Sequence, residues 1–271
     1  GAVEAGPLRT VAFSSDAGSS GALRGRIGLS TEPGARLGFL AANFPAQSIT
    51  LNGTQIDIPA TANGLFIDAS NLTGPVTVSG NNASRVFNIA SGATVAMHSV
   101  RIVNGKAADG GLGSAGENGG GILNAGSLSL FSCTLSGHAT GSGGDGDEGL
   151  GSSGGSGGNG GGIFSSGSLS LTACTLSGNA TGNGGSSTAN GGFGGNGGGI
   201  FSAGSLSLTA CTLTGNAAGT NGDFGSGDGF GGGLSGGSVL LENCLIGLNT
   251  RGGGTPDDVN VTSITYVGGN Q

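Results

Sequence analysis

The sequence predicts an all-β fold: a right-handed, single-stranded parallel β-helix with a short N-terminal capping helix and glycine-rich loops. Two features predict it, a long internal repeat and an alternation of apolar and hydroxyl residues within each copy. Cysteines mark the repeat, with separations of 41, 37 and 33 residues, at Cys133, Cys174, Cys211 and Cys244. Repeats of about 20–50 residues are typical of solenoids, propellers and arrays.

Each copy of the repeat contains three short strand patterns. Residues 168–172 alternate leucines with hydroxyl residues, which predicts a strand with one buried face. Residues 174–177 alternate in the same way, and residues 162–164 supply a third strand. Length varies only after the third strand, so we expect a fixed three-sided rung with one variable loop. The copies are 119–141, 160–182, 197–219 and the degenerate 231–249.

Weaker copies extend the solenoid in both directions. Val76 and Val100 stand in the cysteine position of two upstream copies, and residues 49–53 form an earlier one. Downstream, residues 259–261 and 264–267 supply a last partial coil. We therefore expect one structural domain, with a β-helix of about seven rungs over residues 46–271.

Residues 1–45 are expected to form an N-terminal cap. Within them, Gly18–Glu32 spaces Leu23, Ile27 and Leu29 as in a short amphipathic helix. A solenoid needs such a cover because its terminal rung would otherwise expose the core.

Glycine-rich loops follow the third strand of three copies, at 141–159, 182–196 and 219–230. One interpretation is that they are flexible linkers. The other is packed polyglycine in an extended polyproline II-like form, whose bare backbone needs close hydrogen-bonding neighbours. Because the loops leave the same corner of successive rungs, we expect them to stack into a ridge.

The GGGI…GSLSLT…CTLSGN repeats resemble those of bacterial secreted β-helix proteins, namely the polymorphic outer-membrane proteins and the CSLREA-type surface proteins. Residues 16–27 and 76–90 look like segments of the second group, and the resemblance covers most of residues 16–250. It implies a secreted β-helix that serves as an adhesin, passenger or surface protein. The chain departs from the FxxN repeat by placing Leu or Ile at the phenylalanine, and its glycine loops are longer.

The chain is acidic and poor in charge, with a formal net charge of −7 and 8% charged residues. Lys106 is the single lysine and no basic stripe exists, so we expect no nucleic-acid partner. No apolar run approaches the ~18–20 residues that span a bilayer, so we expect no membrane insertion. A start at Gly1 without a charged-then-apolar leader fits a mature secreted or cell-surface product.

The four cysteines should stack in the interior, because aligned residues of neighbouring rungs lie ~4.8 Å apart. They could form a column of small buried apolar side chains or disulfides between rungs, which that spacing and an extracellular location allow. A zinc site is disfavoured because CxxC pairs are lacking and His98 and His138 lie outside the column. Val76 and Val100 in the same position favour the apolar column.

A second column follows the third strand and comprises His138, Asn179, Asn216 and Asn249. Stacked amides can hydrogen-bond to one another and to the turn backbone, so we expect a structural ladder in which His138 takes an asparagine position. A catalytic histidine is disfavoured because no acid or nucleophile shares its register.

Acidic residues gather in the loops. Asp145, Asp147 and Glu148 are candidate Ca²⁺ ligands, because Ca²⁺ takes several oxygen ligands, although the repeats lack the register of calcium-binding β-rolls. The alternative is solvated loop charge, and no other cofactor is predicted. Paired carboxylates also serve glycosidases and lyases. An enzyme is disfavoured here because the single lysine, the single Tyr and the lack of Trp supply a sugar cleft poorly.

Outward hydroxyl residues form two arrays on successive strands. Regular hydroxyl arrays on a flat solenoid face are also used by ice-binding proteins. We expect the fourth copy to break both arrays, through Leu240 and residues 245–247. The arrays are Ser127/Ser129, Ser168/Ser170, Ser205/Ser207 and Thr134/Ser136, Thr175/Ser177, Thr212/Thr214.

These observations predict a non-enzymatic extracellular or cell-surface structural protein. We expect it to adhere to a host or matrix surface, or to self-assemble into fibres through the ends of the β-helix and the glycine-rich loops. An ice-binding β-helix is the alternative, and a polysaccharide-active β-helix enzyme is a further one.

Overall fold

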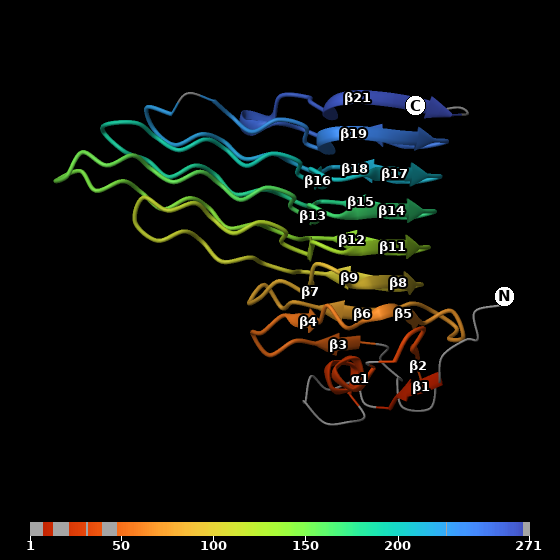
Figure 1. The fold of residues 1–271 in the computed structure, drawn as a ribbon. Helices are drawn as coiled ribbons and strands as arrows, with labels where there is room; N and C mark the ends of the chain where they lie inside the picture. Colours follow the sequence, from red (N-terminus) through yellow and green to blue (C-terminus); the bar gives the residue numbers. More distant parts are fainter. Residues whose placement is uncertain (1–7, 13–21, 31, 40–47, 226, 268–271) are drawn as a thin grey trace.

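The computed structural model is a parallel β-helix, so the fold class predicted from the repeat is confirmed (Figure 1). It describes residues 8–12, 22–30, 32–39, 48–225 and 227–267. The strands stack rung upon rung into a 14-stranded and a 7-stranded sheet, and every pairing of neighbouring rungs is parallel.

Each rung places one strand in each of three columns. The first column holds β4 (Ile56–Ile58), β7 (Phe87–Ile89), β10 (Ile122–Asn124), β13 (Ile163–Ser165) and β16 (Ile200–Ser202). The second holds β1 (Leu8–Val11), β2 (Arg36–Phe39), β5 (Asn63–Asp68), β8 (Thr94–His98), β11 (Ser127–Phe131), β14 (Ser168–Thr172) and β17 (Leu206–Thr209). The third holds β3 (Ser48–Thr50), β6 (Val76–Ser79), β9 (Val100–Val103), β12 (Thr134–Ser136), β15 (Thr175–Ser177), β18 (Thr212–Thr214) and β20 (Leu245–Gly247).

The last two long strands run through a corner of the rung. β19 (Leu234–Glu242) pairs with both β16 and β17, so it joins the first two columns into one sheet. β21 (Val259–Val267) pairs with β19 as a single strand where the sequence predicted two shorter ones. A short 3₁₀ turn, Gly252–Gly254, precedes it.

The core follows from the period of two. In β14, Leu169 and Leu171 point inward, while Ser170 between them faces out. Leu169 aligns with Leu128 below and Leu206 above, so identical side chains stack along the axis. Each fully buried aliphatic side chain contributes about 1.5–3 kcal/mol to folding.

The corner before each cysteine has a fixed conformation. The residue immediately before each cysteine adopts a left-handed backbone conformation with φ of 50–54°. These residues are Ser132, Ala173, Ala210 and Asn243. The chain can therefore turn sharply without an inserted residue, which explains why the spacing between the second and third strands is constant.

A helix, α1 (Leu23–Leu29), lies at the N-terminal end of the stack (Figure 1). It buries Leu23 and Ile27 in the core and contacts β1 and β4. It is shorter than the predicted 18–32 helix, of which residues 18–21 and 31 lie outside the described residues. The predicted cap, 1–45, also contains β1 and β2, which extend the sheet of the β-helix.

Beside the β-helix, four glycine-rich loops form what we term the loop array: residues 107–118, 141–159, 182–196 and 219–230 (Figure 1). The first loop was not among those predicted from the sequence. The backbone amides bond between loops with a period of three: Gly143 donates to Asn183 and Gly146 to Ser186, each at 2.8 Å. Three residues per turn is the period of polyproline II. The loops are therefore packed, and the flexible-linker interpretation is wrong.

The triplet GGx explains the composition of the loop array. Interior positions need glycine because neighbouring backbones approach closely: a Cβ on Gly155 would lie 1.9 Å from the carbonyl oxygen of Ser114. Several outward-facing positions between the glycine pairs carry a hydrogen-bond acceptor. Asp145 Oδ1, for example, accepts the amide of Ser186 on the next loop at 2.8 Å.

A glycine-to-alanine pair tests the loop array. Gly155→Ala forces apart two loops, so it should lower the free energy of unfolding by about 1–3 kcal/mol and reduce amide protection in neighbouring loops. Gly111→Ala is the control, because a Cβ there meets nothing within 4 Å. Thermal unfolding and hydrogen exchange measure both effects. Equal, small effects of the two substitutions would show that the loops are not packed.

Candidate functional site

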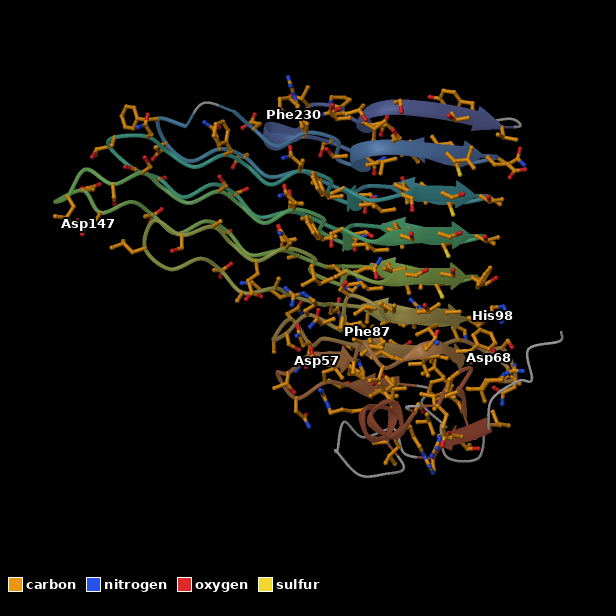
Figure 2. The ribbon with its side chains drawn as sticks, viewed as in Figure 1. Asp57, Asp68, Phe87, His98, Asp147 and Phe230 are labelled. Atoms are coloured by element: carbon orange, nitrogen blue, oxygen red, sulfur yellow. The ribbon has the colours of Figure 1, made fainter. Side chains whose placement is uncertain are left out.

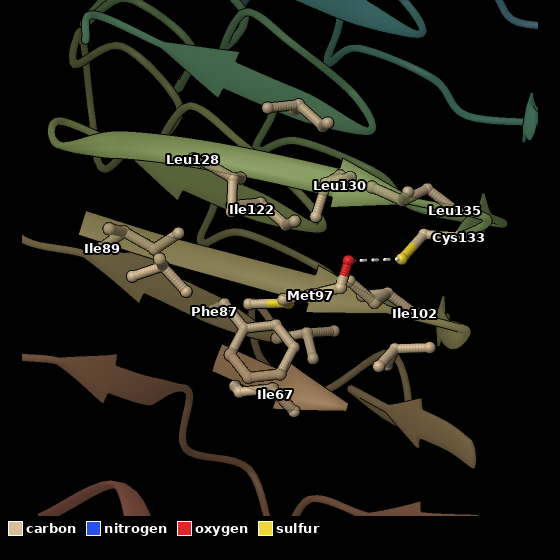
Figure 3. Packing of buried hydrophobic residues seen from close by; sticks show 14 of the residues in the cluster. Ile67, Phe87, Ile89, Met97, Ile102, Ile122, Leu128, Leu130, Cys133 and Leu135 are labelled. Carbon is tan, nitrogen blue, oxygen red and sulfur yellow. Dashed lines mark hydrogen bonds between the residues drawn. The ribbon is translucent and has the colours of Figure 1, made fainter. Parts of the chain in front are cut away.

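The four cysteines are buried and free, so the disulfide alternative is not supported and the apolar column describes them. Their thiols face backbone carbonyls: Cys133 Sγ lies 3.6 Å from the oxygen of Met97 one rung below (Figure 3). Val100 aligns one rung below Cys133 and pairs with Val76, as the sequence predicted. Among the described residues no group of three or more His, Cys, Asp or Glu could hold a metal ion.

Hydrogen bonds along the column shift the thiol pKa values in both directions: the bond with Cys174 lowers the pKa of Cys133, and the bond with Cys211 raises that of Cys244. The hydrogen bond with Cys133, together with burial, raises the pKa of Cys174 to about 12. The hydrogen bond with Cys174 raises the pKa of Cys211 to about 11. Because the thiolate is the reactive form of cysteine, the raised pKa values of Cys174 and Cys211 disfavour reaction at these two thiols, and the burial of all four side chains assigns the column to packing.

Two substitutions at Cys174 test this assignment. Cys174→Ser places a hydroxyl in an apolar column and should lower the free energy of unfolding by about 1–3 kcal/mol. Cys174→Val should be nearly neutral, because valine already holds this position at Val76 and Val100. Chemical denaturation measures both. A large drop in melting temperature caused by reducing agent alone would reveal disulfides and contradict the assignment.

The column of His138 and three asparagines forms a continuous hydrogen-bonded ladder. Asn179 Nδ2 donates to Asn216 Oδ1, and Asn216 Nδ2 donates to Asn249 Oδ1, both at 2.8 Å. Asp258 ends the ladder: its Oδ1 accepts from Nδ2 of Asn249 at 2.8 Å. Each of the three asparagines also holds the turn backbone in place, because its side-chain oxygen accepts a main-chain N–H of the neighbouring rung.

His138 ends the ladder on the other side. Its Nδ1 accepts the amide of Gly105 at 2.8 Å, and its Nε2 donates to the carbonyl of Ile102 at 3.0 Å. The ring is 1% exposed, and this burial lowers the pKa of His138 to about 4. The imidazole is therefore neutral, and both nitrogens are engaged by backbone.

His138 makes stability depend on pH. Between the ordinary histidine pKa of 6.5 and about 4, the unfolded chain binds a proton that the folded chain does not. Stability is therefore fully present above pH 6.5 and falls as the pH drops toward 4, by up to ~3 kcal/mol. His138→Asn, the residue of the other rungs, should remove this loss. Denaturation at several pH values measures it, with the half-exposed His98→Asn as control. An unchanged pH profile in His138→Asn would contradict the assignment.

A second asparagine ladder, at the base of the loop array, was missed by sequence reasoning. Asn118 Oδ1 accepts the amide of Asn159, and Asn159 Oδ1 accepts that of Asn196, both at 2.7 Å. Asp257 completes this line by accepting the amide of Gly231 at 2.9 Å. The signal was present in the triplet GGN at 157–159 and 194–196 and in the related GEN at 116–118.

The candidate calcium ligands serve the loop backbone. Besides the contact of Asp145 with Ser186, Asp147 Oδ1 accepts the amide of Gly149 at 2.9 Å. Figure 2 shows Asp147 at the far edge of the loop array. Asp145, Asp147 and Glu148 do not come together as a metal cluster within the described part of the chain.

One line of the first hydroxyl array is longer than the sequence predicted. It continues past Ser205 to Ser238 and Ser263, whose hydroxyls lie 2.7 Å apart, so the expected break in the fourth copy is wrong for this line. Leu240 does interrupt the neighbouring line of Ser129, Ser170 and Ser207.

A polar cleft of about 740 Å³ lies where the first loop of the array meets the β-helix. Six charged side chains line it, although charged residues make up only 8% of the chain. They pair with one another: Arg85 contacts Glu117, and Lys106 contacts Asp109, each at 3.1 Å. Arg85 also donates to the carbonyls of Gly119 and Asn118, at 2.8 Å each. These contacts make the cleft a structural junction.

Three loop turns expose large apolar side chains at the far edge of the loop array. Leu112, Leu150 and Phe224 are 68%, 83% and 77% exposed. We term these three residues the tip residues. Leu112 and Leu150 each precede a glycine with positive φ, Gly113 and Gly151, whereas Phe224 itself adopts a positive φ of 58°.

Comparison with known protein families and with curated proteins gives no match. No described helix has the length and apolar character to cross a membrane.

Proposed function

We propose that this chain is a non-enzymatic extracellular or cell-surface structural protein that adheres through the far edge of its loop array. The observation that carries the proposal is the combination of a cross-bonded glycine scaffold with exposed apolar tip residues. Exposed apolar side chains that gather at one edge are a common mark of an interaction site.

The packing of the loops favours adhesion energetically. Binding normally orders flexible loops and loses about 0.5–1.5 kcal/mol per side chain that is immobilised. Here the loop backbone is ordered before contact, because its amides bond to neighbouring loops. The tip residues can therefore bury apolar surface without a large entropic loss.

The use of polar groups supports a non-enzymatic role. The loop carboxylates of Asp145 and Asp147 accept backbone amides, and the buried His138 uses both ring nitrogens on backbone. A general acid or base must be within reach of a substrate proton, and these groups face the protein's own main chain.

Self-association into fibres is the second part of the proposal, and the C-terminal rungs support it better than the loops do. Loop amides are largely satisfied within the chain. β21 pairs with β19 on one side and with no described strand on the other. Tyr266 on β21 is 61% exposed, and Leu245 on β20, the last strand of the other sheet, is 50% exposed. An unpaired strand edge offers N–H and C=O groups to a second copy.

A tip variant tests adhesion. The double change Leu150→Ser and Phe224→Ser removes apolar surface while leaving the loop backbone intact, so retention on a sensor coated with extracellular-matrix protein should fall about tenfold or more. Phe131→Ser on β11 is the matched control, because it removes an exposed ring, 39% exposed, from another face. Equal retention of both variants would refute the role of the tip residues in adhesion. Light scattering on the same samples measures self-association separately.

Ice binding is the second candidate, favoured by the hydroxyl line that runs from Ser127 to Ser263 across several rungs. Its equal rung spacing presents hydroxyls at regular intervals. Thermal hysteresis of the purified chain, together with unchanged adhesion of the tip variant, would favour this function over the first.

A further inference from the structure

The outer face of the first strand column carries a short aromatic stack. Aligned positions on successive rungs are Leu123, Phe164, Phe201, Ser235 and Asn260. The rings of Phe164 and Phe201 are stacked, with centroids 5.3 Å apart and an angle of 6° between their planes. The rung spacing of the β-helix therefore equals the spacing of a ring stack.

The stack stops where the repeat becomes degenerate. Ser235 takes the position above Phe201, and it forms the floor of a hollow of about 510 Å³. Phe230, at the base of the last loop, forms another wall (Figure 2). The guanidinium of Arg251 lies over the Phe230 ring, 5.8 Å from its centroid, and holds that ring in place. A third flat ring lying outside Ser235, in line with the rings of Phe164 and Phe201, would continue the stack.

The rest of the described lining is uncharged and mixes polar side chains with Ala203, Val261 and glycines. Asn196, Asn260 and Thr262 supply amides and a hydroxyl, and none of the described lining residues is charged. Asn196 Oδ1 accepts the amide of Phe230 at 2.8 Å, so the orientation of this side chain is fixed. Within the described residues, Asn196 Nδ2 has no hydrogen-bond partner. Because the orientation of this amide is fixed, its N–H group can donate to a ligand in the hollow.

A second hollow of about 550 Å³ adjoins the first and shares Ala203, Gly237 and Thr262 with it. It extends past the corner of β19 to Leu240 and Thr265, and it also contains no charged residue among those described. The two hollows together form a groove across the C-terminal rungs that is longer than one ring.

We propose that this groove binds a neutral oligosaccharide, with one pyranose ring seated above Ser235. The C–H face of the sugar stacks on Phe201, since its weakly positive hydrogens meet the negative face of the ring. Its hydroxyls bond to Asn196, Asn260 and Thr262, and the adjoining hollow takes the next sugar unit. An aromatic side chain fits this lining less well, because it would leave the amides unpaired. No bond is made or broken, and the site does not depend on the tip residues.

Ligand-observed saturation-transfer NMR on the full chain tests the site, with cellobiose, laminaribiose, maltose and mannobiose as probes. At least one should receive saturation, strongest on the C–H face of one ring. Phe201→Ala removes the platform and should weaken binding about fivefold or more. Ser235→Phe fills the seat with the protein's own ring, as Phe201 and Phe164 do one and two rungs below, and should abolish binding without lowering the melting temperature. Phe131→Ala is the control and should bind normally.

Three results would overturn the proposal. They are saturation of none of the four sugars, binding that survives Ser235→Phe, and displacement of the sugar by N-acetylphenylalanine amide at lower concentration than by the sugar itself. The last result would assign the seat to an aromatic side chain of a protein partner. Loss of adhesion in the tip variant with intact sugar binding, or the reverse, separates this site from the proposed adhesive edge.

Discussion

The structure depends on one constraint: most backbone and turn polar groups of a rung are satisfied by the equivalent groups of the next rung. Strands meet this requirement through parallel ladders, the turns through stacked asparagines, and the loops through amides that bond to neighbouring loops. A chain with 8% charged residues has few other means of satisfying polar groups. The common rung spacing therefore explains both the low charge and the high glycine content, because only glycine lets loop backbones approach at that spacing.

The equivalent polar group of a neighbouring rung is missing where the repeat begins and where it ends. Residues other than asparagine therefore occupy the ladder positions there. Gly105 offers no side chain to continue the asparagine ladder, so the longer imidazole of His138 bonds to its backbone instead. At the other end, Asp258 accepts the last amide of that ladder, and Asp257 accepts a backbone amide at the end of the second. These charged or titratable residues resemble candidate catalytic groups in the sequence, yet their chemistry is that of ladder ends.

The sequence predicted most of the β-helix because its signals are local. The alternation in residues 168–172 and the fixed spacing to Cys174 depend only on neighbouring residues. The first loop, 107–118, escaped prediction because alanine and charged residues interrupt its glycines. The bonding between loops also escaped it, because the partner of Gly143 is a residue forty positions away, Asn183, whose register loop lengths alone do not reveal. The groove at Ser235 required the same register, in the copy where the repeat is weakest.

The same constraint indicates where a ligand can bind. Wherever the repeat is regular, each rung uses its polar groups on the next, and little remains to recognise a partner. Recognition must then occur where the stacking is interrupted. The tip residues are one such place, because the loop turns lie beyond the last bonds between loops. The seat above Ser235 is another, because a ring is missing from a stack that Phe164 and Phe201 begin. A ligand that supplies the missing ring would extend a stack whose side chains the folded protein already holds in order. Binding there therefore loses little further conformational entropy.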